Sequence, residues 1–114
     1  MDDCIFCKII AGDIPSDILY RDDEVIAFRD VNPVAPTHIL VIPVQHLQTT
    51  KDIPDENTSL AGNMIRTANR LAIEEGISEN GYRLVINCGE QGGQVVDHLH
   101  MHLIGGRQLS SSLG

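Results

Sequence analysis

One long stretch of this 114-residue chain has the periodicity of an amphipathic helix, with segments typical of strands on both sides of it. The stretch is DENTSLAGNMIRTANRLAIEEG, residues 55–76, and it ends at Gly76, a residue type that commonly stops a helix. Apolar side chains recur in it every three or four residues, as burial of one helix face requires. They are Leu60, Met64, Ile65, Ala68, Leu71 and Ala72. The chain therefore needs a second layer for this helix to pack against.

That second layer is predicted by five shorter segments, residues 17–20, 25–29, 38–43, 82–89 and 98–104. The acidic pair Asp22-Asp23 marks the turn between the first two. Residues 38–43, HILVIP, are apolar and β-branched in an unbroken run, which is typical of a buried strand. Strands, one long helix and then strands again predict an α+β fold with a mainly antiparallel sheet of about five strands. We expect a single domain over residues 1–114.

The chain is acidic, with 16 Asp and Glu against 8 Lys and Arg and a formal net charge of −8 at pH 7. A nucleic acid partner is not expected, because neutralising a phosphate backbone needs a basic surface. No apolar run reaches the ~20 residues that span a bilayer, so no membrane association is expected. The start, MDDCIFCKII, lacks the basic and apolar regions of a secretory signal, and the three cysteines are odd in number. We therefore expect a cytoplasmic protein.

Three of the five histidines stand at alternate positions in VVDHLHMHLIGG, residues 95–106. On a strand, His98, His100 and His102 would project from one face and the apolar residues between them from the other. This stripe of three histidines, residues 98, 100 and 102, has three possible interpretations. It can be a solvated polar face, a three-histidine metal site or a site of phosphate chemistry. A flat strand brings alternate ligands poorly to one ion, whereas imidazoles can attack phosphorus, bind phosphoryl oxygens and transfer protons. Gly92 and Gly93, just upstream, allow backbone N–H groups to approach an anion.

Cys4 and Cys7 form a C-x-x-C pair near the start of the chain. A thioredoxin-type redox motif stands at a helix N-terminus after a strand, and only three residues precede Cys4. The pair can instead be two small buried residues, or half of a tetrahedral zinc site that two histidines complete. Composition and spacing leave these alternatives open.

The segment HLHMHLI resembles the motif of three histidines separated by apolar residues that names the histidine triad (HIT) family of nucleotide hydrolases and transferases. Residues 5–46, IFCKIIAGDIPSDILYRDDEVIAFRDVNPVAPTHILVIPVQH, look like the N-terminal half of that family. Residues 92–109, GGQVVDHLHMHLIGGRQL, are similar to the C-terminal half of its Hint branch. The resemblance implies a purine nucleoside phosphoramidase, which hydrolyses the P–N bond of adenosine 5′-monophosphoramidate-like substrates to AMP.

The resemblance implies a role for four histidines. His100 matches the residue that attacks the α-phosphate and forms a nucleotidyl-histidine intermediate, which water then hydrolyses. His102 would contact the phosphate oxygens, His38 would steer protons near the leaving group, and His98 would support the orientation of the nucleophile. An imidazole suits this two-step reaction because it is both a nucleophile and a good leaving group.

The nucleoside and phosphate contacts are implied in the same way. Asp30 matches the residue that accepts hydrogen bonds from the ribose hydroxyls, with Val31 beside it. Three apolar residues would wall the base pocket, although ordinary core packing explains them equally well: Phe6, Ile9 and Phe28. Four residues match contacts on the phosphate side: Asn87, Gly93, Gln94 and Val95.

The chain departs from the family pattern at three places. Val95 stands where animal members of the branch have a serine that is thought to donate to the leaving group, so acid assistance would pass to His38 and water. Asp97 stands where an aromatic residue usually precedes the histidines, and the sequence offers no physical reason for it. The ending LSSSLG replaces a Trp-Pro-Pro ending that reaches the partner subunit's site.

The resemblance also implies structural zinc. Zinc-bearing relatives use two N-terminal cysteines, a histidine after the VIP strand and the first histidine of the triad, which correspond to Cys4, Cys7, His46 and His98. Cys88 lies outside this pattern and is expected to be a packing residue. No organic cofactor is expected.

A homodimer is implied, and the amphipathic helix and the 82–87 strand are its expected surface. The expected small-molecule partner is a purine nucleotide, AMP or an AMP amide. One alternative is hydrolysis of dinucleoside polyphosphates, against which the short GGR ending argues. A second is a nucleotide-binding regulatory module with little turnover, which the loss of the serine at Val95 leaves open. A third, a metal-storage or structural protein, would have no affinity for nucleotides.

Overall fold

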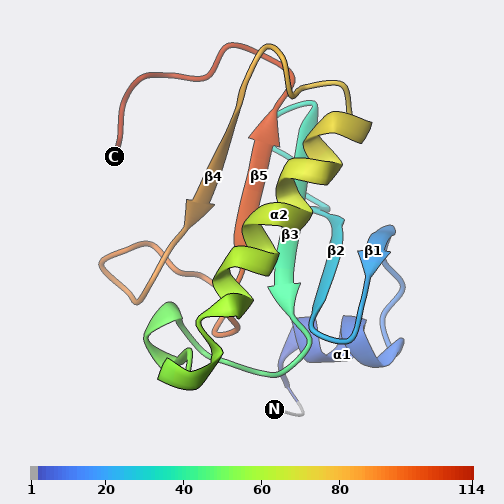
Figure 1. The fold of residues 1–114 in the computed structure, drawn as a ribbon, viewed down its shortest axis with the longest axis vertical. Coiled ribbons are helices and arrows are strands. Elements are labelled where there is room, and N and C mark those ends of the chain that lie inside the picture. The colour runs from blue at the N-terminus through green and yellow to red at the C-terminus, as the bar shows by residue number, and fades with distance from the viewer. Residues whose placement is uncertain (1–2) are drawn as a thin grey trace.

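The structure, a computed structural model, describes residues 3–114. Within that range one five-stranded antiparallel sheet forms, in the order β1-β2-β3-β5-β4 (Figure 1). Its strands are β1 (Ile18–Arg21), β2 (Val25–Arg29), β3 (Thr37–Pro43), β4 (Tyr82–Ile86) and β5 (Met101–Gly105). The predicted α+β class, the antiparallel sheet and the single long helix are confirmed.

The long helix, α2 (Ser59–Glu74), lies across one face of the sheet (Figure 1). It begins later than residue 55, because Asp55–Asn57 form a separate 3₁₀ turn after Pro54. It ends beside Gly76, whose φ of +76° is the left-handed conformation that stops a helix. The prediction that Ile65 is buried is wrong, since 44% of its surface is exposed. Ile65 lies at the edge of the apolar face, and Thr67 is buried instead.

The two faces of the sheet carry two separate apolar clusters. Strand residues on the α2 face pack with the helix and include Val25, Ala27, Ile39, Val41, Met101 and Leu103. Residues of opposite parity face the other way: Ile26, Phe28, Leu40 and Ile42. Because both faces of β2 and β3 are covered, these strands are apolar at successive positions rather than alternate ones. Each fully buried aliphatic side chain contributes roughly 1.5–3 kcal/mol to stability.

The second face is covered by a short helix, α1 (Ile5–Ala11), which periodicity does not predict because seven residues make only about two turns. Its buried residues, Phe6 and Ile9, belong to the cluster of that face. Cys4 caps its N-terminus, where the thiol sulfur accepts the Cys7 N–H at 3.4 Å. The C-x-x-C pair therefore does stand at a helix N-terminus, although no strand precedes it among the described residues.

The central strands β3 and β5 fix the position of two histidines. His38 pairs with Ile104 and Leu40 with His102. In this antiparallel register both histidines project from the face that α1 covers, away from α2. The prediction that residues 98–104 form one strand is wrong, because β5 begins at Met101. His98 and His100 therefore precede the strand, and the three histidines do not form one regular stripe. The expected 82–89 strand also ends early, at Ile86.

The turn between β1 and β2 is held by Asp22, as the acidic pair in the sequence predicts. One carboxylate oxygen of Asp22 accepts the backbone N–H groups of Glu24 and Val25, each at 2.8 Å. The other accepts the Tyr20 hydroxyl at 2.7 Å. Burial alone would raise the pKa of Asp22, but hydrogen bonds from Val25, Tyr20 and Glu24 outweigh it and lower the pKa to about 2.

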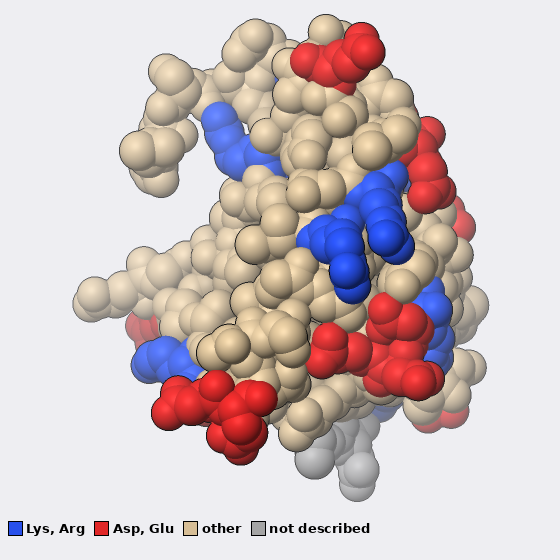
Figure 2. Space-filling model, in the orientation of Figure 1, with Lys and Arg blue, Asp and Glu red and all other residues tan. Residues whose placement is uncertain are grey.

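The charged surface agrees with the composition. On the face drawn in Figure 2, Lys and Arg side chains lie in small separate groups among acidic ones. That face offers a polynucleotide backbone no broad basic surface. Of the helices formed by residues 3–114, none has the combination of length and apolarity needed to cross a bilayer.

Candidate active site and metal cluster

A cavity of about 500 Å³ lies on the sheet face opposite α2, between α1, the 30–36 loop and the 87–96 loop. Its apolar lining includes Phe6, Ile9, Ile14, Phe28 and Leu40. Its polar lining includes Asp30, His38, Asn87, His100 and His102. The residues expected to wall a base pocket are therefore both buried core and cavity lining. The structure brings apolar and titratable groups to one opening, which is typical of a small-molecule site.

His100 is buried beside this cavity and is held by the chain immediately before it. Its Nδ1 lies 2.7 Å from the backbone carbonyl oxygen of His98. A carbonyl oxygen only accepts hydrogen bonds, so Nδ1 is protonated, and the neutral form of this ring has its lone pair on Nε2. The Phe6 ring packs edge-on against the imidazole at 5.3 Å between centroids. Nε2 is thus the His100 nitrogen available for nucleophilic attack.

His38 and His102 form a hydrogen-bonded pair across the two central strands. The Val34 backbone N–H donates to Nδ1 of His38 at 3.2 Å, so Nε2 of His38 carries the proton. That Nε2 lies 2.9 Å from Nδ1 of His102, which must accept. The proton of His102 is therefore on its Nε2. One backbone amide consequently sets the tautomers of both rings, and His102 becomes a hydrogen-bond donor.

His102 is neutral at physiological pH. Burial, with smaller contributions from the neighbouring His100 and His38, lowers the pKa of His102 to about 4, while Asp30 opposes the shift. A phosphate oxygen in the cavity would thus meet the neutral N–H of His102 rather than an imidazolium. The neutral state of His102 follows from the burial of the pair.

Asp30 stands at the end of β2 on the cavity wall. One of its carboxylate oxygens accepts the Asn32 backbone N–H at 2.8 Å, which shapes the 30–36 loop. The other lies 3.4 Å from Nε2 of His38. Val31, beside it, is exposed at the cavity rim. The carboxylate is thus half-buried, next to the histidine pair, with capacity to accept further hydrogen bonds.

The residues expected on the phosphate side lie in the 87–96 loop, but not all of them line the cavity. Asn87 and Gly93 do, and the Asn87 side-chain amide donates to the Gly92 carbonyl at 2.7 Å. Val95 also does, with 90% of its surface exposed at the mouth. Gln94 is not part of the lining; its amide nitrogen donates to the Gln48 carbonyl at 2.7 Å and ties the loop down. A role for Gln94 toward phosphate stays a prediction.

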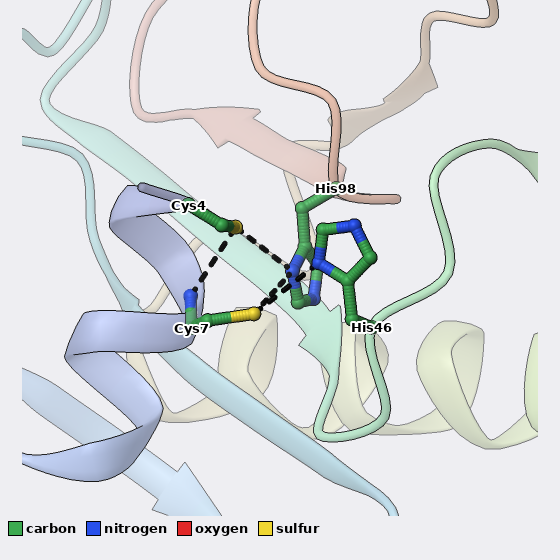
Figure 3. A group of neighbouring side chains, drawn as sticks. All are labelled: Cys4, Cys7, His46 and His98. Carbon is green, nitrogen blue, oxygen red and sulfur yellow. Dashed lines mark hydrogen bonds between the residues drawn. The ribbon is translucent and has the colours of Figure 1, made fainter. Parts of the chain in front are cut away.

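A second group of side chains, the Cys/His cluster, consists of Cys4, Cys7, His46 and His98 (Figure 3). The cysteines come from the start of α1, His46 from the segment after β3 and His98 from the segment before β5. Their ligand atoms all lie within 4.8 Å of one another. The shortest distances are 3.2 Å from Cys7 Sγ to His46 Nδ1 and 3.4 Å from Cys4 Sγ to His98 Nδ1. The four residues predicted as metal ligands are therefore brought together.

The hydrogen bonds around the cluster suit metal binding. His98 is completely buried, and its Nε2 lies 3.0 Å from the Pro43 carbonyl oxygen, to which it must donate. Its Nδ1 lone pair then faces the two sulfurs, which is the usual arrangement of a metal-bound histidine. Burial raises the pKa of the Cys7 thiol, with the adjacent Cys4 adding to the effect. The protonated thiol of Cys7 is therefore favoured in the absence of metal, and a metal ion that binds its sulfur displaces that proton.

Asp30, His38 and His102 also bring three ligand atoms within 4.8 Å, but their hydrogen bonds point to a different use. A metal-bound histidine donates from its other nitrogen. His38 instead accepts the Val34 N–H at Nδ1, which keeps the proton on the Nε2 that would have to bind the ion. Of the two groups, the Cys/His cluster is therefore the better candidate for a metal site.

Several features of the site are absent from the sequence prediction, among them Leu40 and one backbone amide. Leu40 lines the cavity. The sequence is sufficient to predict this, because Leu40 is two residues after His38 on one strand and therefore lies on the same face. The Val34 N–H that fixes the His38 tautomer had no signal, because the direction of a main-chain amide depends on the folded loop. Side-chain patterns therefore locate the site without giving its protonation states.

Comparison with known proteins agrees with this geometry. The sequence model of the HIT domain matches residues 11–109. The purine nucleoside phosphoramidase of Escherichia coli strain K12 is 52% identical over 112 residues, covering 98% of this chain and 94% of that protein. The solved HIT family hydrolase of Legionella pneumophila Philadelphia 1 superposes with a TM-score of 0.94 at 47% identity, covering 98% of this chain and 100% of the other. The HIT family hydrolase of Clostridium thermocellum gives 0.95 at 44% identity, covering 99% and 98%.

Proposed function

The chain belongs to the HIT domain family, and from that membership we propose that it is a purine nucleoside phosphoramidase built as one domain over residues 1–114. Its substrates are adenosine 5′-monophosphoramidates and similar nucleotides, and AMP is the product. The relative named a purine nucleoside phosphoramidase matches 98% of this chain, which supports a single domain. The observation that best supports the activity is the orientation of His100, whose Nδ1–H donates to the His98 carbonyl at 2.7 Å and leaves Nε2 as the free nucleophile.

The reaction divides into two displacements at phosphorus. In the first, the lone pair of His100 Nε2 forms a bond to the α-phosphorus while the P–N bond to the amine breaks. The amine takes up a proton from water beside the His38–His102 pair, which leaves hydroxide. In the second, this hydroxide attacks the same phosphorus, the bond to His100 breaks, and AMP leaves with the added oxygen on its phosphate. His102 donates its Nε2–H to a phosphoryl oxygen, where charge grows in both steps.

The nucleoside is placed by the other cavity residues. Asp30 accepts hydrogen bonds from the ribose hydroxyls, with Val31 closing the rim above them. Phe6, Ile9 and Phe28 contact the base, where their apolar surface favours a flat aromatic ring. The 87–96 loop lies on the phosphate side, with Asn87, Gly93, Gln94 and Val95 as its contact residues. His98 supports catalysis through its backbone carbonyl and binds metal with its side chain.

Val95 also favours a second candidate function, nucleotide binding with little turnover. Its side chain cannot donate a proton, yet it lies at the mouth where a departing amine would pass. If His38 and water do not replace that donor, binding persists while the first displacement slows. The two functions differ in whether the covalent intermediate forms at all.

Trapping that intermediate tests the proposal. The protein is mixed with a slowly hydrolysed AMP amide, quenched within seconds and analysed by intact mass and peptide mapping. A phosphoramidase gains one adenylyl group on His100, and the His100→Asn protein gains none. Adenylyl transfer to another histidine, or no covalent adduct while AMP still binds, would reject the proposed mechanism.

We infer that the Cys/His cluster holds one zinc ion. Two thiolates and two imidazoles are the donor set that tetrahedral structural zinc prefers, and no position is left for water. Such an ion would tie α1 to the segment before β5. It takes no part in the displacements, and its effect on catalysis is to hold the backbone that orients His100.

We also propose that two copies form a homodimer through α2 and β4. β4 is an edge strand, so one side of its backbone lacks a partner among the described residues. Three exposed isoleucines lie on these elements: Ile65, Ile73 and Ile86. A second copy that pairs with this edge would cover them.

A further inference from the structure

Glu75 connects the end of α2 to the loop between β2 and β3. Its two carboxylate oxygens accept Nη1 and Nη2 of Arg29 at 2.8 and 2.7 Å, a two-point ion pair. The first oxygen also accepts the Thr37 hydroxyl at 3.2 Å. Arg29 is the last residue of β2 and Thr37 the first of β3. One carboxylate therefore binds both ends of the 30–36 loop.

The residues that follow these two anchors belong to the candidate active site. Asp30 follows Arg29, and His38 follows Thr37. Because side chains alternate along a strand, Arg29 and Thr37 face α2 while His38 faces the cavity. Glu75 consequently acts from the opposite side of the sheet and cannot touch a bound nucleotide. The residues that follow the two anchors are also joined to each other, since the Asp30 N–H donates to the His38 carbonyl at 3.0 Å.

The loop that Glu75 anchors sets the tautomer of the histidine pair. Val34 lies within it, and its N–H must stay 3.2 Å from Nδ1 of His38 for the proton of His38 to remain on Nε2. The outer side of the loop has one further tie, from Arg107 Nη2 to the Val34 carbonyl at 2.9 Å, and that arginine is exposed. Movement of the anchored ends would move Val34 and Asp30 together.

The Glu75 contacts are strong enough for this task. Only 20% of the Glu75 side chain is exposed, and the pair with Arg29 is charge-assisted at both points. Hydrogen bonding from Arg29 lowers the pKa of Glu75 against the opposing effect of burial, and the Arg29 charge and Thr37 add to the lowering. Asp17 also faces Arg29, at 3.3 Å from Nε, but is mostly exposed and so is the weaker partner.

We propose that Glu75 is a positioning residue for the phosphoramidase reaction: through Arg29 and Thr37 it holds the 30–36 loop so that Asp30 and His38 keep their places in the active site. This rests on the proposed function for its kinetic effect, but not for its effect on His38. Loss of the anchor lets the Val34 N–H leave Nδ1 of His38. The His38 proton then exchanges between its two nitrogens, and His102 loses its fixed donor.

Glu75→Gln tests the proposal, with Glu24→Gln as the matched control. Glu24 is also half-buried and also joins the edge of β2 to α2, by accepting the Asn63 side-chain amide at 2.9 Å, but far from the 30–36 loop. We expect Glu75→Gln to lower kcat/KM for an AMP amide about ten-fold, as small displacements of reacting groups do. We expect kcat/KM of Glu24→Gln to stay within two-fold of the wild-type value, although its melting temperature falls by a similar amount.

A second readout does not need activity. In the wild type, ¹⁵N NMR of His38 should show an unprotonated Nδ1 and a protonated Nε2, and Glu75→Gln should shift both signals toward an average. Thr37→Val keeps the ion pair between Glu75 and Arg29, so we expect a smaller shift of the His38 signals. This variant replaces Glu75→Gln in the test if Glu75→Gln fails to fold. Unchanged His38 signals in both variants would overturn the proposal, as would an equal loss of activity in Glu24→Gln. An inactive wild type with the expected NMR shifts would reject the proposed function and keep the anchor.

Discussion

Nδ1 of His100 donates to the backbone carbonyl of His98 at 2.7 Å, while the side chain of the same His98 reaches into the Cys/His cluster. The proposed nucleophile and the proposed metal site thus share one residue, through its main chain on one side and its imidazole on the other. Anything that moves His98 changes both the tautomer of His100 and the geometry of the cluster. The predictions below separate these effects.

Substitution of His100 by Asn removes the attacking nitrogen at nearly constant volume. We expect AMP to bind as in the wild type, since the cavity keeps its other lining residues. Turnover should fall by several orders of magnitude, as losses of a nucleophile do elsewhere. Steady-state kinetics and calorimetric titration with AMP measure the two quantities. Turnover within ten-fold of the wild type would mean that another group attacks the phosphorus.

Asp30→Ala should weaken binding of ribonucleotides by about 1.5–3 kcal/mol, the usual contribution of hydrogen bonds to a charged group. Removal of the 2′-hydroxyl should then matter much less in the variant than in the wild type. Dissociation constants of AMP and 2′-deoxy-AMP for both proteins give this comparison directly. The same discrimination in both would leave Asp30 as the residue that shapes the turn through the Asn32 N–H, and nothing more.

Protein prepared without chelator should contain about one zinc per chain, at about 2.3 Å from sulfur and 2.0–2.1 Å from nitrogen by X-ray absorption. Cys4→Ser combined with Cys7→Ser should remove the metal and lower the melting temperature more than the activity per folded molecule. Cys88→Ser is the control, because Cys88 lies outside the cluster. Wild-type protein without metal, together with a double variant of unchanged stability, would reduce Cys4 and Cys7 to packing residues.

The pH dependence of stability should report His102. Its folded pKa is lowered to about 4 by burial, while the unfolded value is near 6.5, so the unfolded chain binds a proton first as pH falls. The stability due to neutral His102 is complete above about pH 6.5 and is lost progressively toward pH 4. We expect His102→Asn to lose less stability than the wild type between these values, measured by chemical denaturation.

Asp22→Asn is the control for that experiment. Burial raises the pKa of Asp22, but the hydrogen bonds at its turn outweigh it and bring the pKa to about 2. The contribution of Asp22 is therefore lost only below about pH 4, outside the window of His102. Parallel stability profiles of the wild type and His102→Asn from pH 6.5 to 4 would contradict the assignment of that loss to His102.

The sequence predicts the elements whose side chains repeat regularly. HILVIP could be identified as a buried strand because both faces of β3 are covered, and the long helix because one face of α2 is apolar. Helix α1 could not, since its two turns give periodicity too little length and its N-terminal cap is a cysteine, which is no usual cap. Ile65 was misplaced because it lies at the edge of the helix face, where position along the sequence does not decide burial.

The site was predicted less completely than the fold. Residue types and the family resemblance point to the histidines and to Asp30, and the structure brings His38, His100 and His102 to one cavity. His98 differs because the chain before β5 is not extended as a strand, which turns its side chain toward Cys4. The sequence does not predict the anchor at Glu75, because its partners are distant along the chain. Arg29 lies 46 positions and Thr37 lies 38 positions before Glu75.

The pairing of β3 with β5 makes enzymatic activity a reporter of strand register. His38 lies opposite Ile104 and His102 opposite Leu40, so both imidazoles are directed into the cavity by the same alignment. A slip of one residue on either strand would turn a histidine into the apolar layer beneath α2 and an aliphatic side chain into the active site. A kinetically trapped, misaligned chain would keep much of its secondary structure and hydrolyse nothing. Recovery of turnover during refolding therefore reports only molecules whose central strands are correctly aligned. Circular dichroism does not distinguish them from misaligned molecules with similar secondary structure.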